Sequence, residues 1–224
     1  MIFAIDGASR RNGKPDCLSV GSVFCIYPDG TFGKLVTYEK GSTNQRGELT
    51  ALVNALYDGL YCCRNGITEE IMLITDSEYI YNCLTKEWYV NWQIKGWVTA
   101  EGNPVKNKDL WVKATALLEH LHDGDFEVSV FHIKGHLVSV GKATVRKTIE
   151  ADPSLKSLYD LVQQKYDEAE VKYADKFAYA RELFKTNHGY DAPIETFREM
   201  IVCNTIADLY AGYIADKVDS GSVV

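Results

Sequence analysis

The sequence predicts an α/β fold in which a mixed five-stranded sheet is flanked by helices. Two apolar segments, 19–27 and 31–39, flank the turn signal Pro28–Gly30, which is typical of an antiparallel hairpin. An apolar segment over 1–5, ending at Asp6, would extend the hairpin to a three-stranded antiparallel meander. Two later apolar segments are separated by helical patterns, which indicates buried parallel strands; they cover 71–74 and 126–133.

Helical periodicity occupies much of the chain between these strands. Apolar residues recur every three or four positions in 44–60, which predicts an amphipathic helix; they are Leu49, Leu52, Val53, Leu56 and Leu60. A short helix is predicted through 79–84, and a tryptophan-rich segment and a helix through Leu121 follow it. This order places helices on both faces of the sheet.

The segment from 137 to 203 contains no strand pattern and is predicted to be a helical insertion. Asp152 followed by Pro153 is typical of a helix start, and one apolar face continues from there to Phe184. Gly189 is expected to end this helix.

A final long helix is predicted over 191–218. The chain is therefore expected to form a single domain over 1–217, interrupted at about 137–203, with a flexible tail at 218–224.

Composition limits the classes of function. Hydrophobic residues make up 46% of the chain and charged residues 25%, as in ordinary globular proteins. No apolar run approaches the roughly eighteen residues of a membrane helix, and the start is apolar before it is basic, the reverse of a signal peptide. We therefore expect a cytoplasmic protein without a membrane partner, with its six cysteines reduced, and we expect a monomer.

Four carboxylates border apolar segments. Asp6 and Asp76 each follow an apolar strand, at the edge where open α/β sheets bind ligands. Glu48 precedes the apolar stripe of its helix, and Asp208 lies between Ile206 and Leu209. An alternative reading is that Asp76 only caps the helix that begins at Ser77.

Carboxylates brought together would repel one another unless cations neutralised them. Ligands that are all oxygen atoms favour Mg²⁺ or Mn²⁺ over zinc. Two such ions close together support in-line displacement at phosphorus. The net charge of -7 argues mildly against a nucleic-acid partner, but a metal-binding carboxylate cluster would contribute to this sign.

The sequence resembles the type 1 ribonuclease H family over 1–136 and again over about 204–217. The motifs that carry this resemblance occur in family order; they are AIDGASRRNG, STNQRGELTALVNAL, ITDSEY, EWYVNWQIKGWVTAEGNPVKNKDLW, KGH and NTIADLYA. The resemblance implies a ribonuclease H-like fold and an endoribonuclease that cuts the RNA strand of RNA–DNA hybrids, leaving 5′-phosphate and 3′-hydroxyl ends. It also implies two Mg²⁺ ions per site, with Mn²⁺ able to substitute.

By the same resemblance, the catalytic and metal-binding carboxylates are Asp6, Glu48, Asp76 and Asp208. His136 corresponds to a histidine on a mobile loop that assists turnover or product release. The polar residues at the minor groove would be Asn12, Asn44 and Gln45. Thr43 and Asn107 would help form a pocket for a DNA-strand phosphate. Trp92, with Trp88 close by, would line the channel for the deoxyriboses.

Several of these residues have a structural alternative. Thr43 could equally be the N-cap of the helix that carries Glu48. Trp97 and Trp111 are expected to be packing residues, and the remaining histidines are expected to be structural; these are His120, His122, His132 and His188.

Departures from the family pattern leave other questions open. Glu78 replaces a glutamine of many relatives and is not expected to contact substrate. The tryptophan-rich segment has only a modest surplus of lysines, which predicts weaker and more salt-sensitive hybrid binding. The insertion is either a packed decoration or a surface that covers the substrate or binds a partner protein through Tyr166, Tyr173 and Phe177.

The sequence leaves two alternative functions open. One is a non-catalytic module that binds hybrids or a partner, and the other is a nuclease or recombinase of the same fold that acts on DNA. The presence of all four carboxylates weighs against the first, and the Asn44–Gln45 pair weighs against the second.

Overall fold

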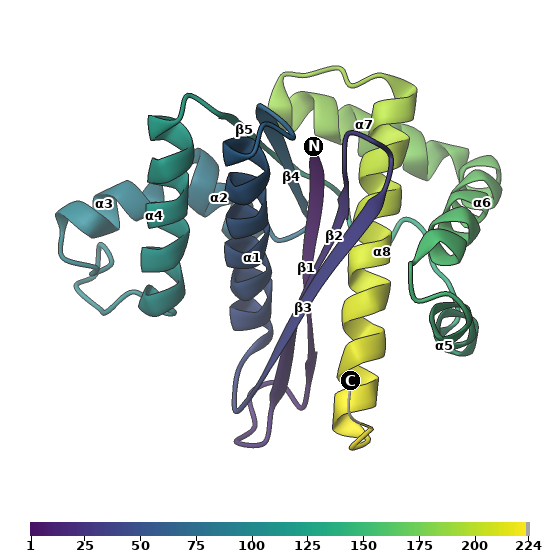
Figure 1. Ribbon diagram of the computed structural model, residues 1–224, viewed down its shortest axis with the longest axis horizontal. Helices are drawn as coiled ribbons and strands as arrows, with labels where there is room; N and C mark the ends of the chain where they lie inside the picture. Colours follow the sequence, from purple (N-terminus) through teal and green to yellow (C-terminus); the bar gives the residue numbers. More distant parts are fainter. Residues whose placement is uncertain (223–224) are drawn as a thin grey trace.

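In the computed structural model, which describes residues 1–222, the chain folds around one five-stranded sheet (Figure 1). Its strands are β1 (Ile2–Arg10), β2 (Leu18–Ile26), β3 (Phe32–Lys40), β4 (Glu70–Thr75) and β5 (Glu127–His132). They lie in the order β3-β2-β1-β4-β5. The pairs β1–β2 and β2–β3 are antiparallel, whereas β4 runs parallel to both β1 and β5. The predicted meander and mixed sheet are confirmed.

Helices cover both faces of this sheet (Figure 1). One face carries α1 (Asn44–Arg64), α2 (Glu78–Thr85), α3 (Trp88–Ile94) and α4 (Lys108–Asp123). The other face carries α8 (Ile194–Asp219) with α5 (Lys142–Ala151), α6 (Lys156–Lys172) and α7 (Ala174–His188) packed around it. Successive side chains of β1 point to opposite faces of the sheet, so Phe3 and Ile5 pack on the α1 side and Ala4 packs on the α8 side.

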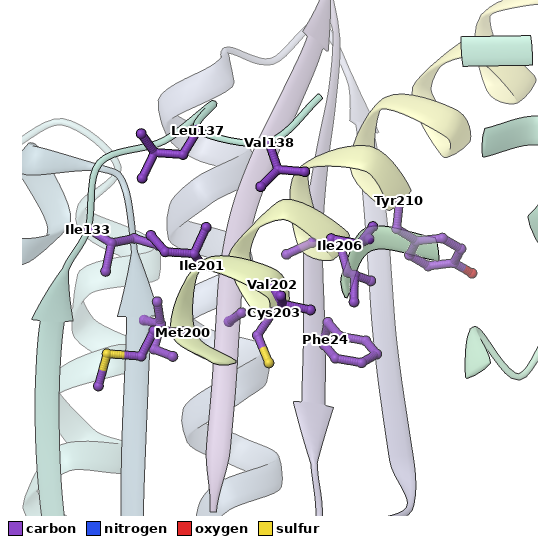
Figure 2. Close-up of a cluster of buried hydrophobic side chains, with 14 of the residues drawn as sticks. Phe24, Ile133, Leu137, Val138, Met200, Ile201, Val202, Cys203, Ile206 and Tyr210 are labelled. Carbon is purple, nitrogen blue, oxygen red and sulfur yellow. The ribbon is translucent and has the colours of Figure 1, made fainter. Parts of the chain in front are cut away.

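The core beneath α8 fixes that helix against the sheet (Figure 2). Met200, Ile201, Cys203 and Ile206 are essentially inaccessible to solvent and pack toward β1, β2 and the segment that follows β5. This burial determines which face of α8 is turned to the strands, and therefore where its polar residues lie.

The prediction of one helix from Asp152 to Phe184 was wrong. The helix begins later, at Lys156, because Asp152 accepts hydrogen bonds from the backbone N–H groups of Ser154 and Ser157 and so closes a turn. The chain then bends at Tyr173, between α6 and α7. The rings of Tyr166 and Phe177 meet edge to face at 5.0 Å, so burial of both favours a bend over a continuous helix.

The described residues 137–203 are helical without strands, as expected. That they are an insertion relative to the family stays a prediction. Helix α8 continues to Asp219, so the first two residues of the predicted tail are helical, and 223–224 lie outside the described residues. Within the described part, all six cysteines are buried free thiols, and no helix is long and apolar enough to cross a bilayer.

Candidate active site

Asp6 and Asp76 occupy equivalent positions beside the end of one strand pairing. The parallel pairing of β1 with β4 ends at Ala4 opposite Ile74, so each aspartate lies two residues beyond the last pair. The prediction that the first strand ends at Asp6 was wrong, because β1 continues to Arg10 as the partner of β2. Asp6 therefore sits on a rigid antiparallel strand, and only 7% of its surface is exposed.

Glu48 reaches this edge from the first turns of α1. Asn44 Nδ2 donates to Glu48 Oε1 at 2.9 Å, and Ser77 Oγ donates to Glu48 Oε2 at 2.7 Å. Gly7 makes the approach possible, because a Cβ at that position would lie 2.7 Å from both Cγ and the backbone N of Glu48. The glutamate is thus held by two donors and packed against β1.

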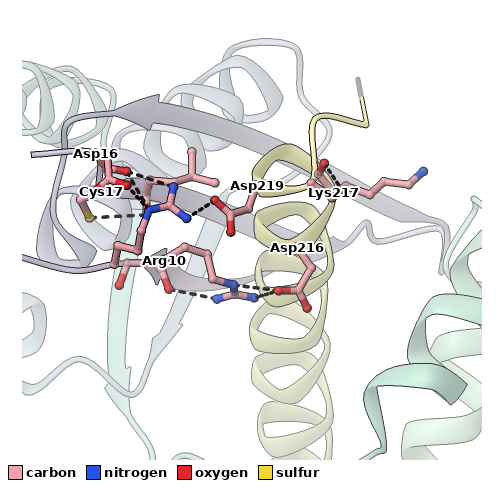
Figure 3. A network of polar contacts seen from close by, with 10 residues as sticks. Arg10, Asp16, Cys17, Asp216, Lys217 and Asp219 are labelled. Atoms are coloured by element: carbon pink, nitrogen blue, oxygen red, sulfur yellow. Dashed lines mark hydrogen bonds and ion pairs between the residues drawn. The ribbon is translucent and has the colours of Figure 1, made fainter. Parts of the chain in front are cut away.

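Asp208 enters from α8, and His136 lies beside it. His136 Nδ1 is 3.6 Å from Asp208 Oδ2, on an exposed loop where His136 has a left-handed φ of 58°. Helix α8 is also tied to the end of β1 by Arg10, which meets Asp216 at 2.6 Å, and by Arg11, which meets Asp219 at 2.5 Å (Figure 3).

The four carboxylates interact electrostatically. Burial raises the pKa of Asp6 well above its usual range, and the negative charges of Asp76, Asp208 and Glu48 raise it further. Burial also raises the pKa of Asp76, where Asp208 adds to the increase and His136 opposes it. Burial raises the pKa of Glu48 too, against the hydrogen bonds from Ser77 and Asn44. The four groups are therefore neighbours whose mutual repulsion a cation would relieve.

The donor set fits a hard divalent cation, since it consists of carboxylate oxygens in a partly buried site. Among residues 1–222, however, no three His, Cys, Asp or Glu side chains already stand in the arrangement of a metal-ligand group.

Three of the predicted substrate residues, Asn12, Asn44 and Gln45, lie around the start of α1. Asn12 Oδ1 accepts from the backbone N–H of Asn44 at 3.3 Å, which brings these two residues together. Gln45 is half-buried beside them. The side chain of Asn44 is committed to Glu48, so it supports a carboxylate in addition to any contact with substrate.

Thr43 is the N-cap of α1, since its hydroxyl accepts from the Arg46 N–H at 3.3 Å. Asn107 occupies the corresponding position at the start of α4, with a left-handed φ of 54°. The two helix starts are joined by Arg46, which donates to both oxygens of Asp109 at 2.8 and 2.7 Å. Thr43 and Asn107, the residues predicted for the phosphate pocket, thus lie on either side of the Arg46–Asp109 ion pair.

The four tryptophans differ in how deeply they are buried. Trp111 is fully buried and donates to Tyr79 Oη at 2.9 Å, and Trp97 packs against the same core. Trp88 is exposed and its ring lies 6.5 Å from that of Trp92, which in turn contacts Trp111. On α3, Trp88 is therefore exposed, and its neighbour Trp92 is partly buried against the core.

Sequence reasoning missed two contributors. Ser77, and not Asp76, is the N-cap of α2, so the alternative in which Asp76 only caps that helix was wrong. Gly135 lies directly against Asp76, where a Cβ would come 3.0 Å from Cγ and 3.2 Å from Cβ of the aspartate. The glycine of the KGH motif was the available signal for this close approach.

A cavity of about 630 Å³ between α5 and α8 adjoins Asp208. His136 and Asp208 line one end of it. Its floor is apolar, with Val138, Val145 and Tyr213, and its lining cations include Lys142 and Arg146, which are paired with Asp216 and Glu150.

The chain is similar in sequence to a known family. The sequence model described as RNase H matches residues 1–152. A ribonuclease H of Clostridium botulinum is 33% identical over 137 residues, which cover 61% of this chain and 83% of that protein. A ribonuclease H of Thermosynechococcus vestitus is 35% identical over 136 residues, which cover 61% of this chain and 77% of that protein.

Among solved structures, the solution structure of the PFV RNase H domain aligns with a TM-score of 0.47 and 22% identity, over 62% of this chain and 81% of that chain. The matched range of the family model, 1–152, includes Asp6, Glu48, Asp76 and His136. Asp208 lies beyond it, and only the fold brings Asp208 to the other carboxylates.

Proposed function

Because the chain belongs to the RNase H family, we propose that it is an endonuclease that hydrolyses the RNA strand of RNA–DNA hybrids. The products are a 5′-phosphate and a 3′-hydroxyl. The observation that best supports this proposal is the electrostatic cluster of Asp6, Glu48, Asp76 and Asp208 at one edge of the sheet. Carboxylates with raised pKa values are typical of sites that bind divalent cations or move protons.

Asp6, Glu48, Asp76 and Asp208 would hold two Mg²⁺ ions, or Mn²⁺ in their place. Bound ions of this kind make a coordinated water more acidic and stabilise charge on the phosphate oxygens. Asn44 and Ser77 each donate to one oxygen of Glu48 and so limit its rotation. His136, exposed beside Asp208, would assist release of the product.

Recognition of the RNA strand requires contacts to its 2′-hydroxyl groups. Asn12, Asn44 and Gln45, grouped at the start of α1, offer amide donors and acceptors for this purpose. The DNA strand would lie toward Thr43, Asn107 and the α3 surface of Trp88 and Trp92. Indole rings suit deoxyriboses because sugars that lack the 2′-hydroxyl present an apolar face.

The decisive experiment compares the wild-type protein with Asp76→Asn on three labelled duplexes of one sequence: RNA–DNA hybrid, double-stranded DNA and double-stranded RNA. With Mg²⁺ or Mn²⁺, the wild type should cut only the RNA strand of the hybrid, and chelator should stop it. Asp76→Asn should abolish cleavage while it retains most of the hybrid binding, because the fold and the amide contacts remain. Cleavage of duplex DNA would favour a DNA-directed enzyme, and binding without any cleavage would favour a non-catalytic module.

A further inference from the structure

The last residue of β5 touches the backbone of Asp76. β5 is an edge strand, and its parallel pairing with β4 ends where His132 lies opposite Thr75. The His132 Nε2–H donates to the carbonyl oxygen of Asp76 at 3.2 Å. This carbonyl belongs to the residue whose carboxylate forms part of the candidate site.

The turn that carries Asp76 is fixed on both sides of this contact. The Ser77 N–H donates to Thr75 Oγ1 at 3.0 Å, and Ser77 Oγ donates to Glu48 at 2.7 Å. Thr75 is buried. The peptide that joins Asp76 to Ser77 is therefore held at both of its polar groups, since its N–H donates to Thr75 and its carbonyl accepts from His132.

Helix α7 in turn holds His132. The Ile133 N–H donates to Thr75 across the sheet, so the backbone groups of His132 point to the open edge. There the Nε2–H of His188, near the end of α7, donates to the His132 carbonyl at 2.9 Å. In this tautomer His188 Nδ1 accepts from the Tyr81 hydroxyl at 3.3 Å. His188 Nε2 also lies 3.2 Å from the His132 backbone nitrogen, so the ring faces both backbone groups of His132.

His188 is placed by packing as well as by hydrogen bonds. Its ring lies 4.5 Å from that of Phe184 and 5.3 Å from that of Phe131. The ring of Tyr81 contacts both histidines, at 5.2 Å from His188 and 5.6 Å from His132. A continuous chain of contacts therefore runs from the 137–203 segment to Asp76.

We propose that His132 is a positioning residue for Asp76, and that α7 acts through His188 as a brace that keeps His132 in place. The inference rests on the proposed function, because it assigns a purpose to the orientation of Asp76. It also gives the 137–203 segment a role that differs from a decoration and from a cover over the substrate. A decoration would affect stability alone and a cover would affect binding, whereas a brace affects the catalytic rate.

Two substitutions at His132 separate positioning from packing. His132→Phe keeps a ring against Tyr81 but removes the donor to the Asp76 carbonyl. His132→Gln loses the ring but can present an amide N–H at a similar position. Positioning predicts that kcat falls about 10- to 100-fold in the phenylalanine variant, as for other small misplacements of a catalytic group, and stays within about threefold in the glutamine variant.

The stabilities should follow the opposite order. The phenylalanine variant should unfold at the same denaturant concentration as the wild type or a higher one, and the glutamine variant at a lower one, because the ring contributes packing. KM and the dissociation constant of the hybrid in chelator should change less than about twofold in both. His188→Phe should lower kcat in the same direction, and His120→Gln, on the exposed face of α4, is the matched control.

Positioning is overturned if His132→Phe keeps its kcat within about twofold, or if the two His132 variants lose activity in proportion to their stability. A rise in the hybrid dissociation constant at unchanged kcat would also overturn it and would favour a cover over the substrate. Asp76→Asn distinguishes the two levels of the argument. Failure of the wild-type protein to cleave the hybrid removes the proposed function, and full activity of Asp76→Asn removes Asp76 from the site. Loss of activity in Asp76→Asn with full activity in His132→Phe removes only the brace.

Discussion

Replacement of Gly135 by alanine tests directly whether the position of Asp76 controls activity. A Cβ at residue 135 would overlap with Oδ2 of Asp76, the nearest atom, and would lie 3.0 Å from its Cγ, whereas ordinary contacts of this kind span 3.4–4 Å. The carboxyl group must therefore retreat by roughly 0.4–1 Å, and its oxygens must turn away. Misplacement of a catalytic group by about 1 Å can cost about 100-fold in rate, which corresponds to about 2.7 kcal/mol in the activation free energy.

The assay is hybrid cleavage at saturating substrate, with the hybrid dissociation constant measured separately in chelator. Gly135→Ala should lower kcat by about 10- to 100-fold and leave binding nearly unchanged, because the displaced group is a carboxylate and no amide donor moves. Gly141→Ala is the matched control, since a Cβ there meets no atom within 4 Å and the φ of -64° suits alanine. If Gly135→Ala cleaves at the wild-type rate, Asp76 does not need its observed position, and the site assignment fails.

Two further predictions follow from the same structure. Asp208→Asn should lower kcat by more than the roughly 10- to 100-fold that is typical when an outer partner of a metal ligand is disturbed. In chelator it should raise the denaturation midpoint, because one repelling charge is removed. Activity within twofold of wild type would exclude Asp208 from the site. Burial lowers the pKa of His188, so the stability that its neutral form contributes is present above the unfolded-state pKa of about 6.5 and declines as the pH falls through that value. Denaturant titrations from pH 7.5 to 5 should show a steeper loss in the wild type than in His188→Gln, by at most about 1.4 kcal/mol per pH unit, and parallel curves would contradict the argument.

Periodicity was sufficient to predict the sheet. Hairpin signals and short apolar runs depend on local sequence, and each strand of this protein carries its own signal. The same patterns placed Asp6 and Asp76 at one edge, because consecutive parallel strands end together. The prediction that four distant carboxylates are neighbours followed from family motifs, and their electrostatic interaction agrees with it.

The failures arose where tertiary packing overrides local signals. No glycine or proline marks the bend at Tyr173, which depends on the contact between Tyr166 and Phe177. The supporting role of Ser77 toward Glu48 joins residues 29 positions apart, and that of His132 toward Asp76 joins residues 56 apart. No periodicity encodes such pairs, so these residues could only be found in the fold.

The placement of Asp208 shows how the core of this protein builds its candidate site. A shift of one residue along α8 would turn the side chain by about 100° and remove it from the other carboxylates. The ion pairs of Arg10 and Arg11 at the far end of α8 are partly exposed, and ion pairs near the surface contribute little free energy. Ala207 and Ala211, by contrast, are fully buried on either side of Asp208. The rotation of α8 is therefore set by its apolar face, and the same burial that stabilises the fold brings the fourth carboxylate to the edge of the sheet.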